Sequence, residues 1–142
     1  MSVVYIETSA LLAWLFGEKR AADVARAVNS AETAVSSLLT CLEAARAIVR
    51  AESYRQISPR QASQLRAMVR NQTSGWRLMH ITNSIVSRAE QSFPIEPVRS
   101  LDAIHLSTVL EFSRRYPELT VLTLDKRLIS NLERLGFESD LG

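Results

Sequence analysis

Four acidic residues in this chain have the residue type and the setting to bind a divalent metal ion: Glu7, Glu43, Asp102 and Asp125. Glu7 and Asp125 each follow a short run typical of a buried strand, Asp102 lies in the first turn of a predicted helix, and Glu43 lies on a largely apolar helix stripe. Carboxylates that gather repel one another and raise one another's pKa values, and a divalent cation relieves that repulsion. Because hard oxygen ligands favour Mg²⁺ or Mn²⁺, these residues are candidate ligands for one of those ions.

Each acid also has an ordinary structural explanation when it is considered alone. Asp125 has the residue type of a helix N-cap, and Asp102 can complement the dipole of the helix that it begins. Glu7 can accept hydrogen bonds from amides of the turn that follows it, and Glu43 can pair with Arg46 on the same helix. Convergence at one end of a sheet would favour a functional site, because the acids would otherwise have to gather there for unrelated reasons.

Short strands alternate with longer helices along the chain, and these elements must position the acids. We expect strands at 3–6, 33–36, 77–81 and 120–124, with an edge strand at 137–139. We expect helices at 10–16, 19–29, from 38 past 50, from 59 past 69, and at 82–91, 101–115 and 126–135. This alternation predicts an α/β fold with a mostly parallel sheet of four to five short strands, covered by helices on both faces. Ligands bind such sheets at the carboxyl ends of the strands, where Glu7 and Asp125 fall.

Several polar residues have the type and position of helix N-caps, namely Ser37, Ser58, Ser100 and Asp125. Thr8 and Ser9 follow the first acid directly, so either residue could orient that acid or cap the first helix. We favour the cap, because it is the commoner use of these residue types at the start of a helix.

The composition is that of an ordinary soluble globular protein. A length of 142 residues predicts a single domain over 1–142, and 46% hydrophobic with 23% charged residues is typical of a folded chain. The longest apolar run, residues 10–16, is much shorter than the roughly 18 residues that a membrane-spanning helix needs. The amino-terminal segment has no signal-peptide pattern, so we expect a cytoplasmic protein with no membrane association.

The ligating and basic residues narrow the chemistry further. One cysteine and two histidines leave too few soft ligands for a structural zinc site. The 17 basic residues comprise 15 arginines and 2 lysines, and arginine suits bidentate contacts to phosphate. A GC-rich coding sequence would explain the same bias, so the bias permits a nucleic-acid partner without establishing one.

Four segments carry a family resemblance, and in chain order they are Ile6-Glu7-Thr8-Ser9-Ala10-Leu11, Leu42-Glu43-Ala44, Leu101-Asp102-Ala103-Ile104-His105-Leu106 and Leu122-Thr123-Leu124-Asp125-Lys126-Arg127-Leu128. Together they resemble PIN domains, and more narrowly the VapC toxins of bacterial type II toxin-antitoxin systems. The resemblance spans residues 6–128, and the last two segments are its most specific part.

This resemblance implies a PIN-like three-layer fold and a ribonuclease that hydrolyses RNA with Mg²⁺ or Mn²⁺ held by the four acids named above. It also implies a cognate antitoxin that blocks the site, and a homodimer. Apolar helix residues beyond the needs of a core agree with a dimer, and they include Leu12, Leu15 and Phe16.

The first acid departs from the family pattern, in which that position is most often aspartate. Glu7 is one methylene longer, which shifts its oxygens by about 1.5 Å, the length of one C–C bond. Small misplacements of reacting groups lower rates steeply, so the departure puts metal affinity and turnover in question.

Residues beside the acids have possible roles in binding RNA. Arg99 precedes Asp102, and Lys126 with Arg127 follows Asp125, so these cations could hold flanking phosphates. His105, three residues after Asp102, could act as a ligand or base, but a lone histidine in an apolar helix is more often packed and hydrogen-bonded.

Two other functions compete with the ribonuclease. The main alternative is a non-catalytic PIN-like module that binds RNA or a protein partner, with Glu7 marking a degenerate metal site. A receiver-like phosphoacceptor domain is disfavoured, because its central aspartate should follow a middle strand, whereas strands 33–36 and 77–81 are followed by Ser37 and Thr82. Metal-dependent cleavage separates the ribonuclease from the binding module.

Overall fold

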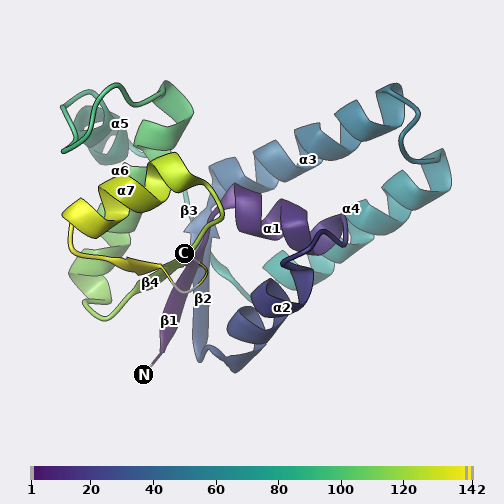
Figure 1. Ribbon diagram of the computed structural model, residues 1–142, viewed down its shortest axis with the longest axis horizontal. Coiled ribbons are helices and arrows are strands. Elements are labelled where there is room, and N and C mark those ends of the chain that lie inside the picture. The colour runs from purple at the N-terminus through teal and green to yellow at the C-terminus, as the bar shows by residue number, and fades with distance from the viewer. Residues whose placement is uncertain (1, 140, 142) are drawn as a thin grey trace.

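A five-stranded, all-parallel sheet forms the centre of the computed structural model, which describes residues 2–139 and 141 (Figure 1). Its strands are β1 (Val3–Ile6), β2 (Thr33–Ser37), β3 (Arg77–Met79), β4 (Thr120–Leu122) and β5 (Glu138–Ser139). The order in the sheet is β3-β2-β1-β4-β5. The predicted α/β class is confirmed, and the sheet is parallel throughout rather than mostly parallel.

β1 is the central strand, and its sequence explains its position. All four of its residues, Val-Val-Tyr-Ile, are buried. β1 pairs with β2 on one side and with β4 on the other. A continuous apolar run of this kind suits a strand that helices cover on both faces.

Seven helices surround the sheet within the described residues: α1 (Thr8–Leu15), α2 (Ala21–Ser30), α3 (Leu38–Ser53), α4 (Pro59–Thr73), α5 (Asn83–Ala89), α6 (Ser100–Arg115) and α7 (Lys126–Arg134). Successive side chains of a strand point to opposite faces. Val3 and Tyr5 therefore join a core cluster with residues of α6 and α7, whereas Val4 and Ile6 join a second cluster with residues of α1 and α2. The sheet thus has a packed helical layer on each face.

The chain reverses its direction across the sheet between β1 and β4. It progresses from β1 through β2 to β3 on one side, then returns through α5 and α6 to β4 and β5 on the other side (Figure 1). The connecting helices leave β1 and β4 on different faces at this point, which opens a crevice at the carboxyl ends of the two strands.

Three helix starts follow the predicted capping residues, and the start of α6 does not. The side chains of Ser37, Ser58 and Asp125 cap α3, α4 and α7 as expected. The prediction for Ser100 is wrong, because Ser100 is already helical and the N-cap is Arg99, which has an extended backbone. The helical ladder begins at the Arg99 carbonyl, which accepts from the Ala103 amide at 2.8 Å, so α6 starts one residue early without a side-chain cap.

Two strands are shorter than predicted. β3 ends at Met79 and β4 at Leu122, so the two residues after each strand lie outside the ladder.

Three apolar helix residues that suggested a dimer surface contact the core. Leu15 is buried in the second core cluster, and Leu12 and Phe16 pack against it. Within residues 2–139 and 141, no helix is long and apolar enough to cross a membrane.

α3 and α4 form an antiparallel pair that extends away from the sheet (Figure 1). Ile48 of α3 is fully buried, whereas its neighbour Val49 is 39% exposed. We expect Ile48→Ala to lower the free energy of unfolding by about 2–4 kcal/mol, because it removes buried methyl groups and leaves a cavity. Val49→Ala is the matched control and should change it by less than about 1 kcal/mol. Urea unfolding followed by circular dichroism measures both values, and equal effects would contradict this packing.

Candidate metal and RNA site

The four predicted acids come from four different elements around the carboxyl end of the sheet. Glu7 directly follows β1, and Asp125 follows β4, the neighbouring strand. Glu43 lies in the second turn of α3, which leaves β2 on the other side of β1, and Asp102 lies in the first turn of α6. Parallel strands end at the same edge of a sheet, so this topology directs the acids to the crevice between β1 and β4.

Glu7 is the most enclosed of these acids, with 6% of its surface exposed. Its Oε1 accepts three hydrogen bonds, from the Ser9 amide at 3.1 Å, the Ser9 hydroxyl at 2.5 Å and the Thr123 hydroxyl at 2.6 Å. Oε2 takes part in none of these bonds. Burial raises the pKa of the Glu7 carboxyl despite the opposing effects of His105 and of these donors.

Glu7 is itself the N-cap of α1, so the cap predicted for Thr8 or Ser9 is wrong. Glu7 has an extended backbone, and Thr8 is the first helical residue. The two hydroxyls are instead turned toward the acids: Ser9 donates to Glu7, and Thr8 donates to Oε1 of Glu43 at 2.6 Å. Both residues therefore orient candidate ligands. For Ser9 this is the alternative that the sequence left open, whereas Thr8 orients Glu43 and not the first acid.

Thr123 joins the ends of β1 and β4. Its hydroxyl donates to Glu7 and accepts from the Asp125 amide at 3.1 Å. The Leu124 amide donates to the Ser9 hydroxyl at 2.8 Å, and the Glu7 amide donates to the Leu122 carbonyl at 3.0 Å. These bonds hold the segment of Asp125 beside Glu7.

Sequence reasoning gave Thr123 no role. The available signal was a hydroxyl residue within an apolar strand end, two residues before a candidate acid. Asp125 itself has its predicted structural use, because its Oδ1 accepts from the Arg127 amide at 2.9 Å and caps α7.

Glu43 is half-buried and is held by α1 and α6. Its Oε1 accepts from Thr8 and lies 2.7 Å from Nε2 of His105, and 26% of its side chain is exposed. Burial alone would raise the pKa of the Glu43 carboxyl, but the hydrogen bonds from His105 and Thr8 hold the pKa below its ordinary value. The ion pairs among the described residues do not join Glu43 to Arg46, so the surface pairing considered from the sequence does not form.

Asp102 lies within the electrostatic influence of the other acids. Its side chain is 20% exposed and is 3.6 Å from Nε of Arg99. Burial and the negative charges of Asp125 and Glu43 raise the pKa of the Asp102 carboxyl, while Arg99 and His105 act in the opposite direction. Asp102 of α6 therefore lies close enough to Asp125 and Glu43 to be affected by both negative charges.

His105 is packed and hydrogen-bonded, as expected for a histidine in an apolar helix. It is 2% exposed and contacts the Tyr5 hydroxyl through Nδ1 at 2.8 Å. Burial raises the pKa of the Tyr5 phenol well above its ordinary value, so Tyr5 is a neutral hydrogen-bonding group. Sequence reasoning placed Tyr5 only in the strand, because an aromatic residue in an apolar run has no signature that separates a polar role from packing.

The acids offer oxygen ligands without forming a closed cage. Within residues 2–139 and 141, no three His, Cys, Asp or Glu side chains converge closely enough to hold a metal ion by themselves. Mg²⁺ usually keeps several waters and binds through one or two carboxylates. The mutual repulsion at Asp102 is the charge imbalance that a cation would relieve, so the donor set fits a hydrated Mg²⁺ or Mn²⁺.

A groove of about 690 Å³ begins at Asp102 and continues between the 95–99 loop and α7. Arg99, Lys126 and Arg127, the three predicted phosphate contacts, are exposed and line it. The other lining residues are Ile95, Glu96, Pro97, Val98, Leu106, Leu128, Ser130 and Asn131. The groove therefore combines cations with an apolar wall beside the acids, a combination that suits a nucleotide chain.

Comparison with solved structures agrees with the architecture. The chain is similar to Mycobacterium tuberculosis VapC20, a sarcin-ricin loop cleaving toxin, with a TM-score of 0.64 and 16% identity over 94% of this chain and 95% of that one. It is also similar to a chain of a toxin-antitoxin complex from Klebsiella pneumoniae, with a TM-score of 0.59 and 20% identity over 91% of this chain and 92% of the other. At these identities the likeness shows the fold. A search among curated proteins gives no match.

The PIN domain family model matches residues 4–135, a range that contains all four acids, Thr123 and His105. The resemblance seen in the four short segments thus extends over nearly the whole chain. The chain belongs to the PIN-domain family.

Proposed function

We propose that this protein is a ribonuclease dependent on Mg²⁺ or Mn²⁺, the toxin of a toxin-antitoxin pair, which hydrolyses RNA phosphodiester bonds. The observation that carries the proposal is the placement of Glu7, Glu43, Asp102 and Asp125 around the crevice where the strand order reverses. Membership of the PIN-domain family and structural similarity to a VapC toxin support it.

The residues of the candidate site form an acidic part, which would hold the metal, and a cationic part, which would hold phosphates. A bound Mg²⁺ or Mn²⁺ would supply the Lewis acidity that polarises the phosphodiester and an attacking water. All four acids would hold that ion. Asp102, Asp125 and Glu43 are half-buried, and Glu7 is the most enclosed. Arg99, Lys126 and Arg127 would hold the phosphates of the strand in the adjacent groove.

The expected reaction is an in-line displacement at phosphorus. An oxygen of water forms the new P–O bond, the bond to O3′ breaks, and O3′ leaves with a proton. The products therefore carry a 3′-hydroxyl and a 5′-phosphate. These ends distinguish the reaction from cleavage by attack of the 2′-hydroxyl, which gives a cyclic phosphate.

The family and the assembly of one structural relative support the proposed partners. We propose a cognate antitoxin that covers the acids, since one similar chain comes from a toxin-antitoxin complex. Leu42 is 57% exposed beside Glu43, and Val49 lies on the same face of α3, so an apolar patch adjoins the acids. We further propose that the protein is a homodimer acting in the cytoplasm.

A second function, a PIN-like module that binds RNA or protein without cleavage, is favoured by one observation. Oε1 of Glu7 caps α1 and accepts from the hydroxyls of Ser9 and Thr123, so the most enclosed of the acids is committed to the fold through that atom. The first acid would then be structural. Cleavage assays separate the two functions.

We expect the purified protein, freed of any antitoxin, to cleave total cellular RNA with Mg²⁺ or Mn²⁺. EDTA should abolish this cleavage. Asp102→Asn should lower the rate at least about 100-fold, because it removes a charge from the acidic cluster while keeping the shape of the side chain. Gel electrophoresis follows the cleavage, and mapping of the RNA ends should find 5′-phosphates and 3′-hydroxyls.

The matched control is Glu111→Gln, on the same helix but at its opposite end. It should cleave at the wild-type rate. Inactivity of folded wild-type protein on all RNAs with both metals would favour the binding module. Cyclic phosphate ends, or equal rates for wild type and Asp102→Asn, would point to a contaminating ribonuclease and contradict the proposal.

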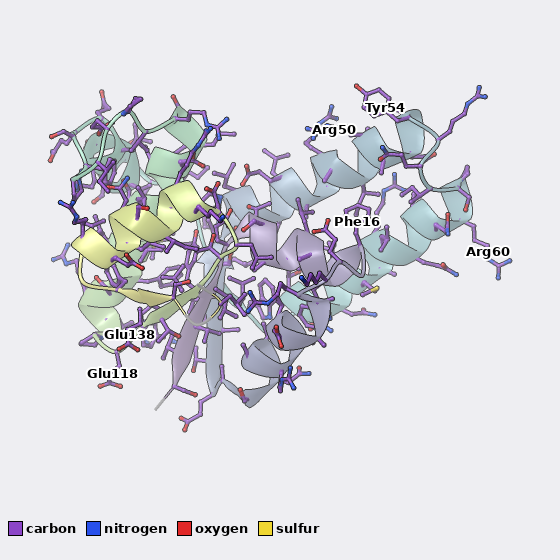
Figure 2. All side chains as sticks on the ribbon, viewed as in Figure 1. Phe16, Arg50, Tyr54, Arg60, Glu118 and Glu138 are labelled. Atoms are coloured by element: carbon purple, nitrogen blue, oxygen red, sulfur yellow. The ribbon has the colours of Figure 1, made fainter. Side chains whose placement is uncertain are left out.

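The basic residues of the groove give a prediction for binding. Replacing Lys126 and Arg127 together by alanine should weaken RNA binding and reduce the slope of log Kd against log salt by about 1.4, since roughly 0.7 counterions are released per phosphate contact on single strands. Arg60→Ala is the control, because Arg60 lies at the far tip of the α3–α4 pair (Figure 2). Fluorescence anisotropy with the Asp102→Asn protein measures both slopes without cleavage. An unchanged slope would remove these cations from the RNA path.

The buried charge of Glu7 gives a prediction for stability. The pKa of Glu7 is raised in the folded protein, so the folded state binds the proton more readily and loses stability as pH rises through that pKa. Glu7→Gln keeps an oxygen for the three donors and removes the charge, so it should be more stable than wild type at pH 7. The difference should shrink as pH falls toward the ordinary range of glutamate. Urea unfolding in EDTA at several pH values measures it, with exposed Glu18→Gln as the control. A difference that does not vary with pH would contradict the prediction.

A further inference from the structure

His105 of α6 uses both of its ring nitrogens on partners from two other elements. Nδ1 lies 2.8 Å from the Tyr5 hydroxyl of β1, and Nε2 lies 2.7 Å from Oε1 of Glu43 on α3. Tyr5 is fully buried and His105 is 2% exposed, whereas 26% of the Glu43 side chain is exposed. The three residues therefore form a chain of hydrogen bonds that runs from the core to the surface of the acidic site.

The chemistry of the partners fixes the direction of these hydrogen bonds. A carboxylate oxygen only accepts, so Nε2 carries a proton and donates it to Glu43. In a neutral imidazole the other nitrogen is then an acceptor, and the Tyr5 hydroxyl donates to Nδ1. Thr8 donates its single proton to Glu43 at 2.6 Å, and its oxygen, 3.2 Å from Nε2, also accepts from His105. The His105 tautomer with its proton on Nε2 therefore satisfies every group in this hydrogen-bonded chain of side chains.

This arrangement fixes one oxygen of Glu43 and leaves the other out of the network. Oε1 is held from α1 and from α6 at once, which selects one rotamer of a side chain that is long and partly exposed. A ligand that is ordered before the metal arrives loses less conformational entropy on binding. Partners that orient a ligand in this way raise metal affinity in known metal sites.

We propose that His105 is a positioning residue that orients the Glu43 carboxylate for a divalent cation, and that Tyr5 holds the imidazole from behind. The proposal rests on the proposed function, because it assumes that the acids bind a metal. It assigns His105 no direct contact with the metal or with RNA. It also explains why two polar side chains are buried here: Tyr5 belongs to the first core cluster, and His105 is 2% exposed.

The test measures Mn²⁺ affinity directly, by the loss of the electron paramagnetic resonance signal of free Mn²⁺ on titration into the protein. We expect His105→Leu, which removes both hydrogen bonds, to weaken Mn²⁺ binding about 10- to 100-fold. His105→Gln can still present an amide N–H to Glu43 and should recover most of the affinity. Tyr5→Phe keeps the ring contact with Phe112 and should weaken binding by less than His105→Leu.

The matched control is Ser107→Ala on the same helix. Ser107 is also 2% exposed, and its hydroxyl finds no hydrogen-bond partner within residues 2–139 and 141. It should bind Mn²⁺ as wild type does. RNA cleavage gives a second readout, because excess Mn²⁺ should restore the activity of His105→Leu, whereas a merely structural defect would not respond to metal.

The outcomes separate this inference from the proposed function. Wild-type protein that binds no Mn²⁺ would overturn both. Binding by wild type and by folded His105→Leu with affinities within about twofold would overturn the inference alone. If His105→Leu does not fold, as thermal melting would reveal, Tyr5→Phe decides the question. Wild-type Mn²⁺ affinity in that variant would refute the role of the Tyr5–His105–Glu43 hydrogen bonds.

Discussion

The parallel pairing of β1 with β4 is the constraint on which the rest of the structure depends. The chain leaves these neighbouring strands toward opposite sides of the sheet, so their carboxyl ends are not covered by one connecting helix. Hydrogen bonds from Thr123 and Leu124 to Glu7 and Ser9 then join the two strand ends beyond the ladder. If this register shifted by one residue, Glu7 and Thr123 would lie on opposite faces of the sheet, and these hydrogen bonds would be lost.

Polar groups buried where the ends of β1 and β4 meet are costly unless each has a hydrogen-bond partner, and the structure supplies those partners. Ser36 donates to the Ile6 carbonyl at 2.5 Å and lies 2.9 Å from the Thr40 hydroxyl, so even the residues behind Tyr5 are satisfied. The remaining strain is electrostatic. Glu7 and Asp102 both have raised carboxyl pKa values, which means that folding works against their charged forms.

The sequence was sufficient to predict the α/β class and most element positions, because apolar periodicity and N-cap residues report local structure. Strand ends were less predictable: residues 80–81 and 123–124 have strand-like types, but no neighbour extends the ladder there. Ser100 was misassigned because Arg99, with its extended backbone, is the N-cap, so the helix starts at Ser100 without a side-chain cap. The local sequence pattern does not indicate the backbone conformation of the loop that precedes a helix.

The candidate acids were predictable from residue type and from their place after a strand, for Glu7 and Asp125, or on a predicted helix, for Glu43 and Asp102, but their partners were not. His105, Tyr5 and Thr123 lie in apolar runs, where their residue types are equally compatible with packing. Their roles depend on contacts between residues as much as 116 positions apart, such as that of Glu7 with Thr123. Only the folded sheet brings those pairs together.

Three of the acids share a division between their two oxygens. In Glu7, Glu43 and Asp125 the hydrogen bonds that hold the side chain in the fold all go to one oxygen, Oε1 or Oδ1, and leave the second oxygen out. Each carboxylate thus serves architecture with one atom and can serve a ligand with the other. Alanine at these positions would remove both uses at once and confound a folding defect with a chemical one. Glutamine or asparagine keeps the architectural oxygen and isolates the chemistry.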